Sequence, residues 1–227
     1  MVTKLTGELV EKLLLVDSPT VSNAIETLHV RSRRDGYMGP QIQCRFPDLG
    51  AVVGTAVTCT IVDYEPDFPP DPKERLKWLE AIADANEPVI CVVQDRCYKK
   101  GWSSHWGEIV GTQVQVLGSV GIVTDGAVRD LEALHKMGMN VWSESVVVSH
   151  GHIDVGEAQI PVNVGGLIVQ PGDILHADVN GVVSIPRDIL NRLPDAIQQI
   201  LDSERTTIED LRKNGYDFET HRKTIQH

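Results

Sequence analysis

The alternation of apolar and polar positions is clearest between residues 119 and 136. Residues 120–123 form a short apolar run, which predicts a buried strand. Asp125 and Gly126 then predict a tight turn, and Val128, Leu131 and Leu134 recur at the spacing of a helix that starts at residue 127. This prediction places residues 129 and 130 in the first turn of the helix. In open α/β sheets, ligands bind beyond the carboxyl ends of the strands, so this is a candidate site.

The same periodicities predict elements along the rest of the chain. Alternating strands and helices between residues 50 and 140, followed by β-rich sequence with hairpin signals, indicate one α/β domain over residues 1–227. We expect helices within residues 1–30, a long helix at 187–214 and a loosely held tail at 215–227. Other predicted helices are 73–85 and 109–117; predicted strands are 51–62, 88–94, 141, 145–149, 160–164, 167–169, 174–177 and 182–185.

Composition narrows the class of function. The net charge of −11 over 227 residues argues against a nucleic-acid groove, which needs clustered basic residues. Arg31, Arg33 and Arg34 form one small basic cluster, which we interpret as a solvated loop. No apolar run reaches the length of a membrane span. Four cysteines without a C-x-x-C pair, together with the lack of a signal peptide, predict reduced thiols and a cytoplasmic location.

Charged side chains cluster at the starts of two predicted helices. Glu108 opens the helix at 109–117, and one helix-plus-strand unit separates it from Arg129 and Asp130. Two carboxylates and an arginine could therefore share one pocket, with oxygen ligands suited to Mg²⁺ or Mn²⁺. The alternative interpretation is structural: Asp130 caps its helix, and Arg129 pairs with Glu132.

Three histidines offer weaker signals. His150 and His152 flank a glycine, and no third ligand is obvious nearby, so we interpret the pair as part of a turn and not as a metal site. His176 lies within a predicted strand, where a packed core histidine is the better interpretation.

The spacing of the charged residues resembles a known signature. Glu108, twenty further residues and then Arg129-Asp130 are similar to the acidic-X20-Arg-Asp pattern of the metal-dependent class II pyruvate aldolases. These are the 4-hydroxy-4-methyl-2-oxoglutarate/4-carboxy-4-hydroxy-2-oxoadipate aldolases, which share their fold with RraA, a regulator of ribonuclease activity. The usual first acid of that pattern is aspartate, whereas this chain has glutamate. Residues 18–24, 53–58, 171–178 and 180–186 also look similar to the family.

The resemblance implies roles for individual residues. Asp130 would hold Mg²⁺ or Mn²⁺ directly, and Glu108 would hold it through a water molecule. Arg129 would donate hydrogen bonds to the keto oxygen of a short 2-oxo acid as negative charge develops there. The substrate carboxylate would be bound by main-chain groups at the start of the helix, those of Gly107, Ile109 and Val110.

The resemblance also implies a fold and an assembly. The fold would be a three-layer β/β/α swivelling-type domain with a long C-terminal helix, assembled as a trimer or as a dimer of trimers. A glutamate of a neighbouring subunit's C-terminal helix would approach the site, with Glu204 as the first candidate and Glu209 as the second. We expect self-association and a small-molecule substrate, with no nucleic-acid or membrane partner.

The function implied is a lyase that cleaves a C–C bond through a pyruvate enolate, by retro-aldol reaction or by decarboxylation of oxaloacetate. One alternative is a non-catalytic regulator like RraA; such regulators usually lack the first acidic residue, so Glu108 favours an enzyme. A methyltransferase is a second alternative. It is disfavoured because no glycine-rich loop follows a first strand to hold an adenosyl cofactor.

Overall fold

A nine-stranded mixed sheet forms the body of the protein in the computed structural model, which describes residues 4–213, 217–219 and 222. In chain order its strands are β1 (Gln43–Cys44), β2 (Val52–Asp63), β3 (Val89–Asp95), β4 (Ser104–Trp106), β5 (Ser119–Val128), β6 (Asn140–Val146), β7 (Ile153–Ala158), β10 (Ile174–Asp178) and β11 (Gly181–Ile185). The main path runs β1-β6-β5-β3-β2-β10-β11, while β4 pairs with β5 and β7 pairs with β2. The centre of the sheet, β2-β3-β5-β6, is parallel.

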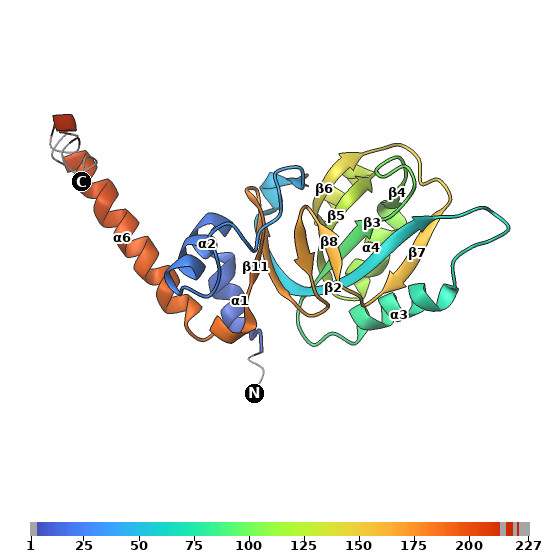
Figure 1. Cartoon of the computed structure of the whole chain (residues 1–227), viewed down its shortest axis with the longest axis horizontal. Coiled ribbons are helices and arrows are strands. Elements are labelled where there is room, and N and C mark those ends of the chain that lie inside the picture. Colours follow the sequence, from blue (N-terminus) through green and yellow to red (C-terminus); the bar gives the residue numbers. More distant parts are fainter. Residues whose placement is uncertain (1–3, 214–216, 220–221, 223–227) are drawn as a thin grey trace.

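Helices cover two regions of this sheet. In chain order they are α1 (Gly7–Leu14), α2 (Ser18–Thr27), the short 3-10 helix η1 (Pro47–Leu49), α3 (Pro72–Ala83), α4 (Glu108–Val116), α5 (Leu131–Lys136), the 3-10 helix η2 (Arg187–Ile189) and α6 (Leu193–Lys213). A two-stranded hairpin, β8 (Val162–Val164) with β9 (Leu167–Val169), completes the fold. The sheet curls into a nearly closed barrel, beside which α1, α2 and α6 form a helical lobe (Figure 1).

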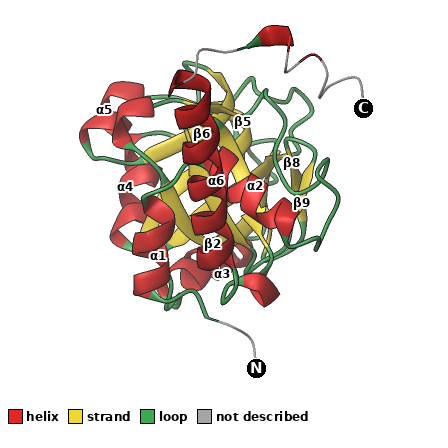
Figure 2. Ribbon diagram, turned by 90° about the vertical axis from the view of Figure 1, so that its left-hand side faces the viewer, coloured by secondary structure: helices red, strands yellow, loops and turns green. Residues whose placement is uncertain are grey.

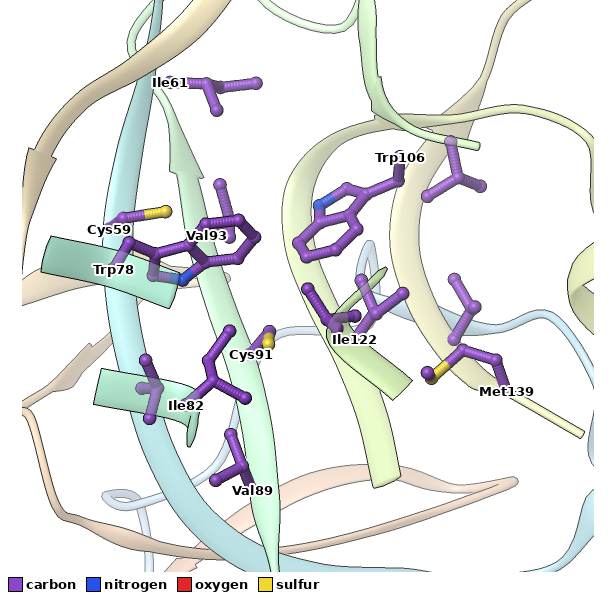
Figure 3. Packing of buried hydrophobic residues seen from close by; sticks show 14 of the residues in the cluster. Cys59, Ile61, Trp78, Ile82, Val89, Cys91, Val93, Trp106, Ile122 and Met139 are labelled. Atoms are coloured by element: carbon purple, nitrogen blue, oxygen red, sulfur yellow. The ribbon is translucent and has the colours of Figure 1, made fainter. Parts of the chain in front are cut away.

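Alternation along the central strands builds three layers. Cys59 of β2 and Cys91 of β3 point to one face, where they pack with Trp78 and Ile82 of α3 (Figure 3). Their neighbours in sequence, such as Val92, point to the opposite face and pack in a second core cluster with β8 and β9. Because successive strand residues face opposite ways, one sheet serves both cores. The layers are thus helix, sheet and hairpin, which confirms the predicted β/β/α class.

The helical lobe has a core of its own. Leu13 of α1, Val21 of α2 and Ile197 of α6 pack with β10 and β11. Two buried polar groups fix this lobe to the sheet. Asp178 accepts hydrogen bonds from the backbone N–H and hydroxyl of Ser18, each at 2.7 Å, and Nε2 of His176 lies 3.1 Å and 3.0 Å from the backbone carbonyl oxygens of Leu13 and Val16. His176 is therefore a packed core residue.

The C-terminal helix α6 is long, as predicted, and extends away from the barrel in Figure 1; seen from that side, it lies in front of the sheet (Figure 2). It begins at residue 193 and not at 187, because residues 187–189 form the separate turn η2. Most of the predicted tail at 215–227 lies outside the described residues. Within the described part of the chain, no helix is both long and apolar enough to cross a membrane.

One local prediction is wrong and bears on the site. Residues 125 and 126 do not form a turn, and no helix starts at residue 127. Instead β5 continues through Val128, since Ala127 and Val128 are buried and pair with both β4 and β6. The ladder between β5 and β6 only shifts register between Thr124 and Ala127. Gly126 is needed for close packing, because a Cβ there would lie 2.9 Å from Oδ2 of Asp95.

Other differences come from short or polar strands. The sequence pattern missed β4 and β7, which carry polar residues beside loops, and it divided the continuous strand β6 into two pieces. It assigned no strand to residues 43–44, which form β1 and pair with β6. The remaining predicted helices and strands are confirmed within a few residues at their ends.

Candidate active site

The end of β5 and the start of α4 meet at one point of the surface. Arg129 follows β5 directly, and its backbone N–H donates to the carbonyl of Trp106 at 2.9 Å. Asp130 comes next, and its Oδ2 accepts a hydrogen bond from the backbone N–H of Glu108 at 3.1 Å. The guanidinium Nε of Arg129 lies 3.6 Å from the same oxygen. Residues 108, 129 and 130 are thus brought together.

Asp130 adopts a left-handed backbone conformation, with φ 55° and ψ 40°. This conformation is uncommon outside glycine, although aspartate and asparagine tolerate it best. Asp130 is the residue before the first turn of α5, yet its side chain makes no capping bond to that helix. The carboxylate reaches across to α4 instead. Within the described residues, the Asp130 side chain thus bonds the start of α4 and not its own helix, and the ion pair of Arg129 is with Asp130 instead of Glu132.

Gly107 allows the close approach of these groups. A Cβ at this position would lie 2.5 Å from Oδ2 of Asp130 and 3.0 Å from Nε of Arg129. The backbone of Gly107 is extended, with φ −149°, so any residue could adopt its conformation. A side chain at this position would therefore have to displace the ends of the two charged side chains.

The first turn of α4 presents free N–H groups beside this carboxylate. The first N–H groups of a helix have no intrahelical partner and attract anions. The N–H of Glu108 is used by Asp130, and those of Ile109 and Val110 follow it in the same turn. The side chain of Glu108 is exposed, as is that of Ile109, whereas Val110 is half-buried.

A cavity of about 290 Å³ opens beside Arg129. Its walls come from α3, β4, the start of α4 and the segment around β7. The lining residues are Arg75, Ser104, His105, Gly107, Ile109, Val110, Arg129, His150 and Ile153. The cavity therefore reaches from the helix start and Arg129 to side chains that the sequence pattern had not linked to the site.

His105 forms a buried wall of this cavity. Its ring packs edge-on against Trp78 and Trp106, with centroid distances of 5.8 Å and 5.6 Å. Its Nε2 is buried and has no hydrogen-bond partner among the described residues. Burial lowers the pKa of His105 to about 4, with Asp154 opposing the shift and Arg75 adding to it. The imidazole is therefore neutral near pH 7.

Behind the site, buried carboxylates hold the segment between β3 and β4. Asp95 accepts hydrogen bonds from the N–H groups of Cys97 and Gly101, both at 2.8 Å. Asp125 accepts one from the N–H of Asp95 at 2.7 Å, and Nζ of Lys100 lies 3.0 Å from its other oxygen. Burial raises the pKa of Asp125, against the opposing effect of these bonds. This clamp fixes the loop that leads into β4. Sequence reasoning missed it because Asp125 looked like a turn residue.

One carboxylate oxygen at this point remains available to a ligand. Oδ2 of Asp130 is engaged by Glu108 N–H, while Oδ1 carries no hydrogen bond within the described residues, and the side chain is 40% exposed. In the described part of the chain no group of three His, Cys, Asp or Glu side chains could form an all-protein cage. Mg²⁺ commonly binds through one or two carboxylates and keeps several waters. Asp130 could supply one such carboxylate, whereas only the backbone N–H of Glu108 is shown to reach it.

Two further candidates lie elsewhere. Glu204 contacts Asn23 of its own chain, with Oε1 and Nδ2 3.4 Å apart, and Glu209 pairs with Lys213 at 3.1 Å. Both belong to α6, on the far side of the molecule from α4 in Figure 1. Neither glutamate completes the site of its own chain. His150 and His152 lie in the segment between β6 and β7, where His150 lines the cavity beside Arg129 and His152 packs against Tyr64.

A larger cavity, of about 540 Å³, lies away from these groups between residues 4–7 and 84–87. Two carboxylates line it: Asp84, which is exposed, and Glu87, which is partly buried and already engaged. Glu87 accepts hydrogen bonds from the N–H of Leu5, the hydroxyl of Thr55 and the guanidinium of Arg187. The smaller cavity beside Arg129 is therefore the better candidate for chemistry.

The three layers and the long C-terminal helix define a mixed α/β protein of the β/β/α type. The chain belongs to the RraA-like family, described as Aldolase/RraA, whose model matches residues 18–184. That match includes Glu108, Arg129 and Asp130 and ends before α6.

Individual relatives cover smaller parts of the chain. An uncharacterized protein of Methanocaldococcus jannaschii is 34% identical over 101 residues, which are 44% of this chain and 49% of the relative. A protein of Halalkalibacterium halodurans named "Putative 4-hydroxy-4-methyl-2-oxoglutarate aldolase" is 29% identical over 82 residues, 36% of this chain and 39% of that protein. The chain thus matches about half or less of the length of these curated relatives.

Among solved structures, RraAS2 of Streptomyces coelicolor superposes with a TM-score of 0.71. The superposition covers 91% of this chain and 100% of that one, at 24% sequence identity. At this identity the likeness establishes the shared fold.

Proposed function

We propose that the protein is a divalent-metal-dependent lyase that cleaves a C–C bond of a short 2-oxo acid. The observation that carries this proposal is the contact between the N–H of Glu108 and Oδ2 of Asp130, at 3.1 Å. It joins the start of α4, a carboxylate and the guanidinium of Arg129; the helix start and Arg129 line the cavity, whereas Asp130 does not. Relatives named as aldolases support the same reaction class.

Asp130 would hold Mg²⁺ or Mn²⁺ through its carboxylate, and Glu108 would orient a water of the ion from the neighbouring helix start. When bound, such an ion supplies Lewis-acid polarisation of the substrate's keto oxygen. Asp130 is suited to this role because Glu108 N–H fixes one oxygen and leaves the other available. Gly107 keeps the space in which that carboxylate lies.

Arg129 has the electrostatic role. Its guanidinium lies beside Asp130 and lines the cavity, where it can donate to a keto oxygen as negative charge develops. The N–H groups of Ile109 and Val110 would bind the adjacent substrate carboxylate at the start of α4. Together these groups would fix the C1–C2 end of a 2-oxo acid.

Two reactions share the resulting intermediate. In a retro-aldol reaction the C3–C4 bond breaks, its electron pair forms a pyruvate enolate, and the proton of the C4 hydroxyl is lost as a carbonyl product forms. In oxaloacetate the bond to the C4 carboxylate breaks instead and CO₂ leaves. In both cases protonation of the enolate at C3 gives pyruvate, so one site could perform both.

We also propose that the site is completed by a neighbouring copy of the chain. Glu204 or, second, Glu209 of the partner subunit would approach it in a trimer or in a dimer of trimers. The exposed position of both residues on the projecting helix α6 supports this arrangement.

All four cysteines are free thiols, which supports the expected cytoplasmic location.

The test is pyruvate release from oxaloacetate and from a 4-hydroxy-2-oxo acid, with Mg²⁺ or Mn²⁺ and with a chelator. We expect turnover only with the ions, and none in Arg129→Ala or Asp130→Ala. Glu132→Ala is the matched control, because it removes an exposed carboxylate two residues from Asp130 and should retain activity. A folded protein that releases no pyruvate from either substrate would refute the lyase proposal and favour the RraA-like regulator.

A further inference from the structure

His150 belongs to the loop that joins β6 to β7, and it lines the cavity of the candidate active site. This loop is tied to the rest of the fold on both sides of the histidine. Before it, the carbonyl of Ser149 accepts a hydrogen bond from the N–H of Ser104 at 2.9 Å. After it, the carbonyl of His152 accepts one from the N–H of Tyr64, also at 2.9 Å. The loop therefore holds the main chain of His150 at the edge of the cavity.

The two ring nitrogens of His150 have different surroundings. Nδ1 lies 2.7 Å from the carbonyl oxygen of Gly151. Because a carbonyl oxygen can only accept, Nδ1 is the nitrogen that carries the hydrogen of this bond. Neutral imidazole has one N–H group, so Nε2 then carries a lone pair, and it has no hydrogen-bond partner among the described residues. Since the residue is exposed and lines the cavity, this lone pair is available to a molecule bound there.

His150 is also the side chain best suited to take up a proton among those described along this cavity. The two arginines of the lining are already protonated near neutral pH. The hydroxyl of Ser104 donates to the carbonyl of Trp106 at 2.6 Å, and Nε2 of His105 is buried. The other lining residues are glycine or aliphatic. An acid–base step in this cavity therefore falls to His150.

We propose that His150 is the general base of the retro-aldol reaction and returns the same proton to the product. The inference rests on the proposed function, in which Arg129 and the start of α4 hold the C1–C2 end of the substrate. Imidazole is the side chain most often used for this task, because it accepts and releases protons near neutral pH.

The proposed step balances without a further reactant. Nε2 of His150 takes the proton of the C4 hydroxyl, and the electron pair of the O–H bond forms the new carbonyl. The C3–C4 bond breaks, and its electron pair forms the enolate of pyruvate. The protonated Nε2 then gives its proton to C3. Pyruvate and a carbonyl product leave, and His150 is neutral again.

Oxaloacetate supplies an internal comparison, because its decarboxylation needs no base. Its C4 carboxylate has no proton to lose at neutral pH, and water can protonate the enolate that remains. His150→Gln should therefore lower kcat for cleavage of 4-hydroxy-2-oxoglutarate by about 10²–10⁴-fold and leave oxaloacetate decarboxylation within about threefold. Pyruvate release by the full chain with Mg²⁺ or Mn²⁺ measures both reactions.

His152→Gln is the matched control. His152 is a second exposed histidine of the same loop, but it packs against Tyr64 and is not among the residues that line the cavity. This variant should keep both reactions. Because both histidines are exposed, thermal unfolding should give the same Tm for the two variants and the unmodified protein.

Nuclear magnetic resonance tests the geometry of His150 without metal or turnover. Long-range ¹H–¹⁵N correlation of the imidazole rings distinguishes hydrogen on Nδ1 from hydrogen on Nε2. The signals of His150 are those that His150→Gln lacks. At a pH where histidine is neutral, we expect the hydrogen on Nδ1, as the bond to Gly151 requires. Hydrogen on Nε2 would leave no lone pair towards the cavity and would overturn the proposal.

The cleavage assays separate this inference from the lyase proposal. A selective loss of aldol cleavage in His150→Gln, with decarboxylation retained, supports both. Unchanged aldol cleavage, or an equal loss of both reactions, would refute the role of His150 and leave the lyase standing. If the unmodified protein releases pyruvate from neither substrate, the lyase is refuted and the role of His150 with it.

Discussion

Replacing Gly107 with alanine is the sharpest test of the site geometry. The new Cβ would lie 2.5 Å from Oδ2 of Asp130 and 3.0 Å from Nε of Arg129, so both side chains must move. Normal van der Waals contact requires the carboxylate oxygen to shift by roughly 1 Å. That shift breaks or lengthens its 3.1 Å hydrogen bond from the N–H of Glu108. The backbone is not strained, because φ at this position is −149°.

Gly107→Ala should lower the free energy of unfolding only slightly, but it should reduce the rate of turnover strongly. One lost hydrogen bond destabilises by about 1 kcal/mol, which lowers Tm by about 2–4 °C in a chain of this size. Misplacement of a site group by about 1 Å can reduce turnover by about 10²-fold. Calorimetric unfolding and metal-dependent pyruvate release measure the two effects on the same preparation.

Gly39→Ala is a matched control for this experiment. Its Cβ would also meet the end of a flexible side chain, that of Gln41, but in a loop remote from Asp130. Its activity should therefore stay near that of the unmodified protein. Full activity in Gly107→Ala would refute the claim that Gly107 provides the space that the carboxylate of Asp130 needs for turnover. A fall in Tm far beyond a few degrees would show that Gly107 is needed for folding instead.

Three further changes test other parts of the structure. Asp130→Asn keeps the shape of the side chain and tolerates the left-handed backbone but removes the charge. The affinity for Mn²⁺, measured by electron paramagnetic resonance, should therefore fall by roughly tenfold or more. Unchanged affinity would place the ion elsewhere. Burial lowers the pKa of His105 from 6.5 to about 4, so below pH 6.5 the unfolded chain binds the proton more readily, and the free energy of unfolding falls by about 3 kcal/mol between pH 6.5 and pH 4. Denaturant titrations at these two pH values should show a smaller loss of unfolding free energy in His105→Phe. An equal loss in the variant would contradict the assignment of this pH dependence to His105. The pKa of Glu87 is lowered because hydrogen bonds from Arg187 and Thr55 outweigh the opposing effect of burial, so the ionised carboxylate stabilises the fold above pH 4.5 and this contribution is lost as the pH falls. Glu87→Gln should therefore lower the unfolding free energy at pH 7 and not at pH 2. A decrease of the same size at both pH values would exclude a contribution from the ionised carboxylate.

Strong periodicity made much of the fold predictable from the sequence. The alternating segment of β2 and the apolar run of β3 are buried on both faces, so their patterns were unambiguous. The spacing of Glu108, Arg129 and Asp130 was informative for a related reason. One helix and one parallel strand separate them, and parallel strands bring equivalent positions to the same edge.

The error at residues 125–128 has a specific physical origin. Asp125-Gly126 is a turn signal when local preferences decide, but here tertiary contacts decide. Asp125 is buried against Lys100, and Gly126 packs on Asp95, which belongs to a strand 30 residues earlier in sequence. No local pattern reports such contacts. As a result, the strand was predicted to end before Ala127, and Arg129 was placed inside a helix.

The cavity wall at His105 was also beyond a local pattern. β4 has only three residues, all buried, and its pairing with β5 depends on a loop held by Asp95. Arg75 comes from a different helix, whose exposed face gave no sign of a ligand. Trp106 follows His105 directly in the sequence, but Trp78 belongs to α3. The packing of His105 between these two rings is therefore recognisable only once the chain is folded.

The left-handed conformation of Asp130 limits what mutation can do at this position. A β-branched or bulky residue would meet a steric penalty in the main chain before any question of charge arose. Glycine would relieve the backbone but remove the carboxylate, and asparagine would keep the shape without the charge. Few side chains besides aspartate therefore suit this backbone, and of those that do only aspartate carries the charge that the proposed metal ligation requires.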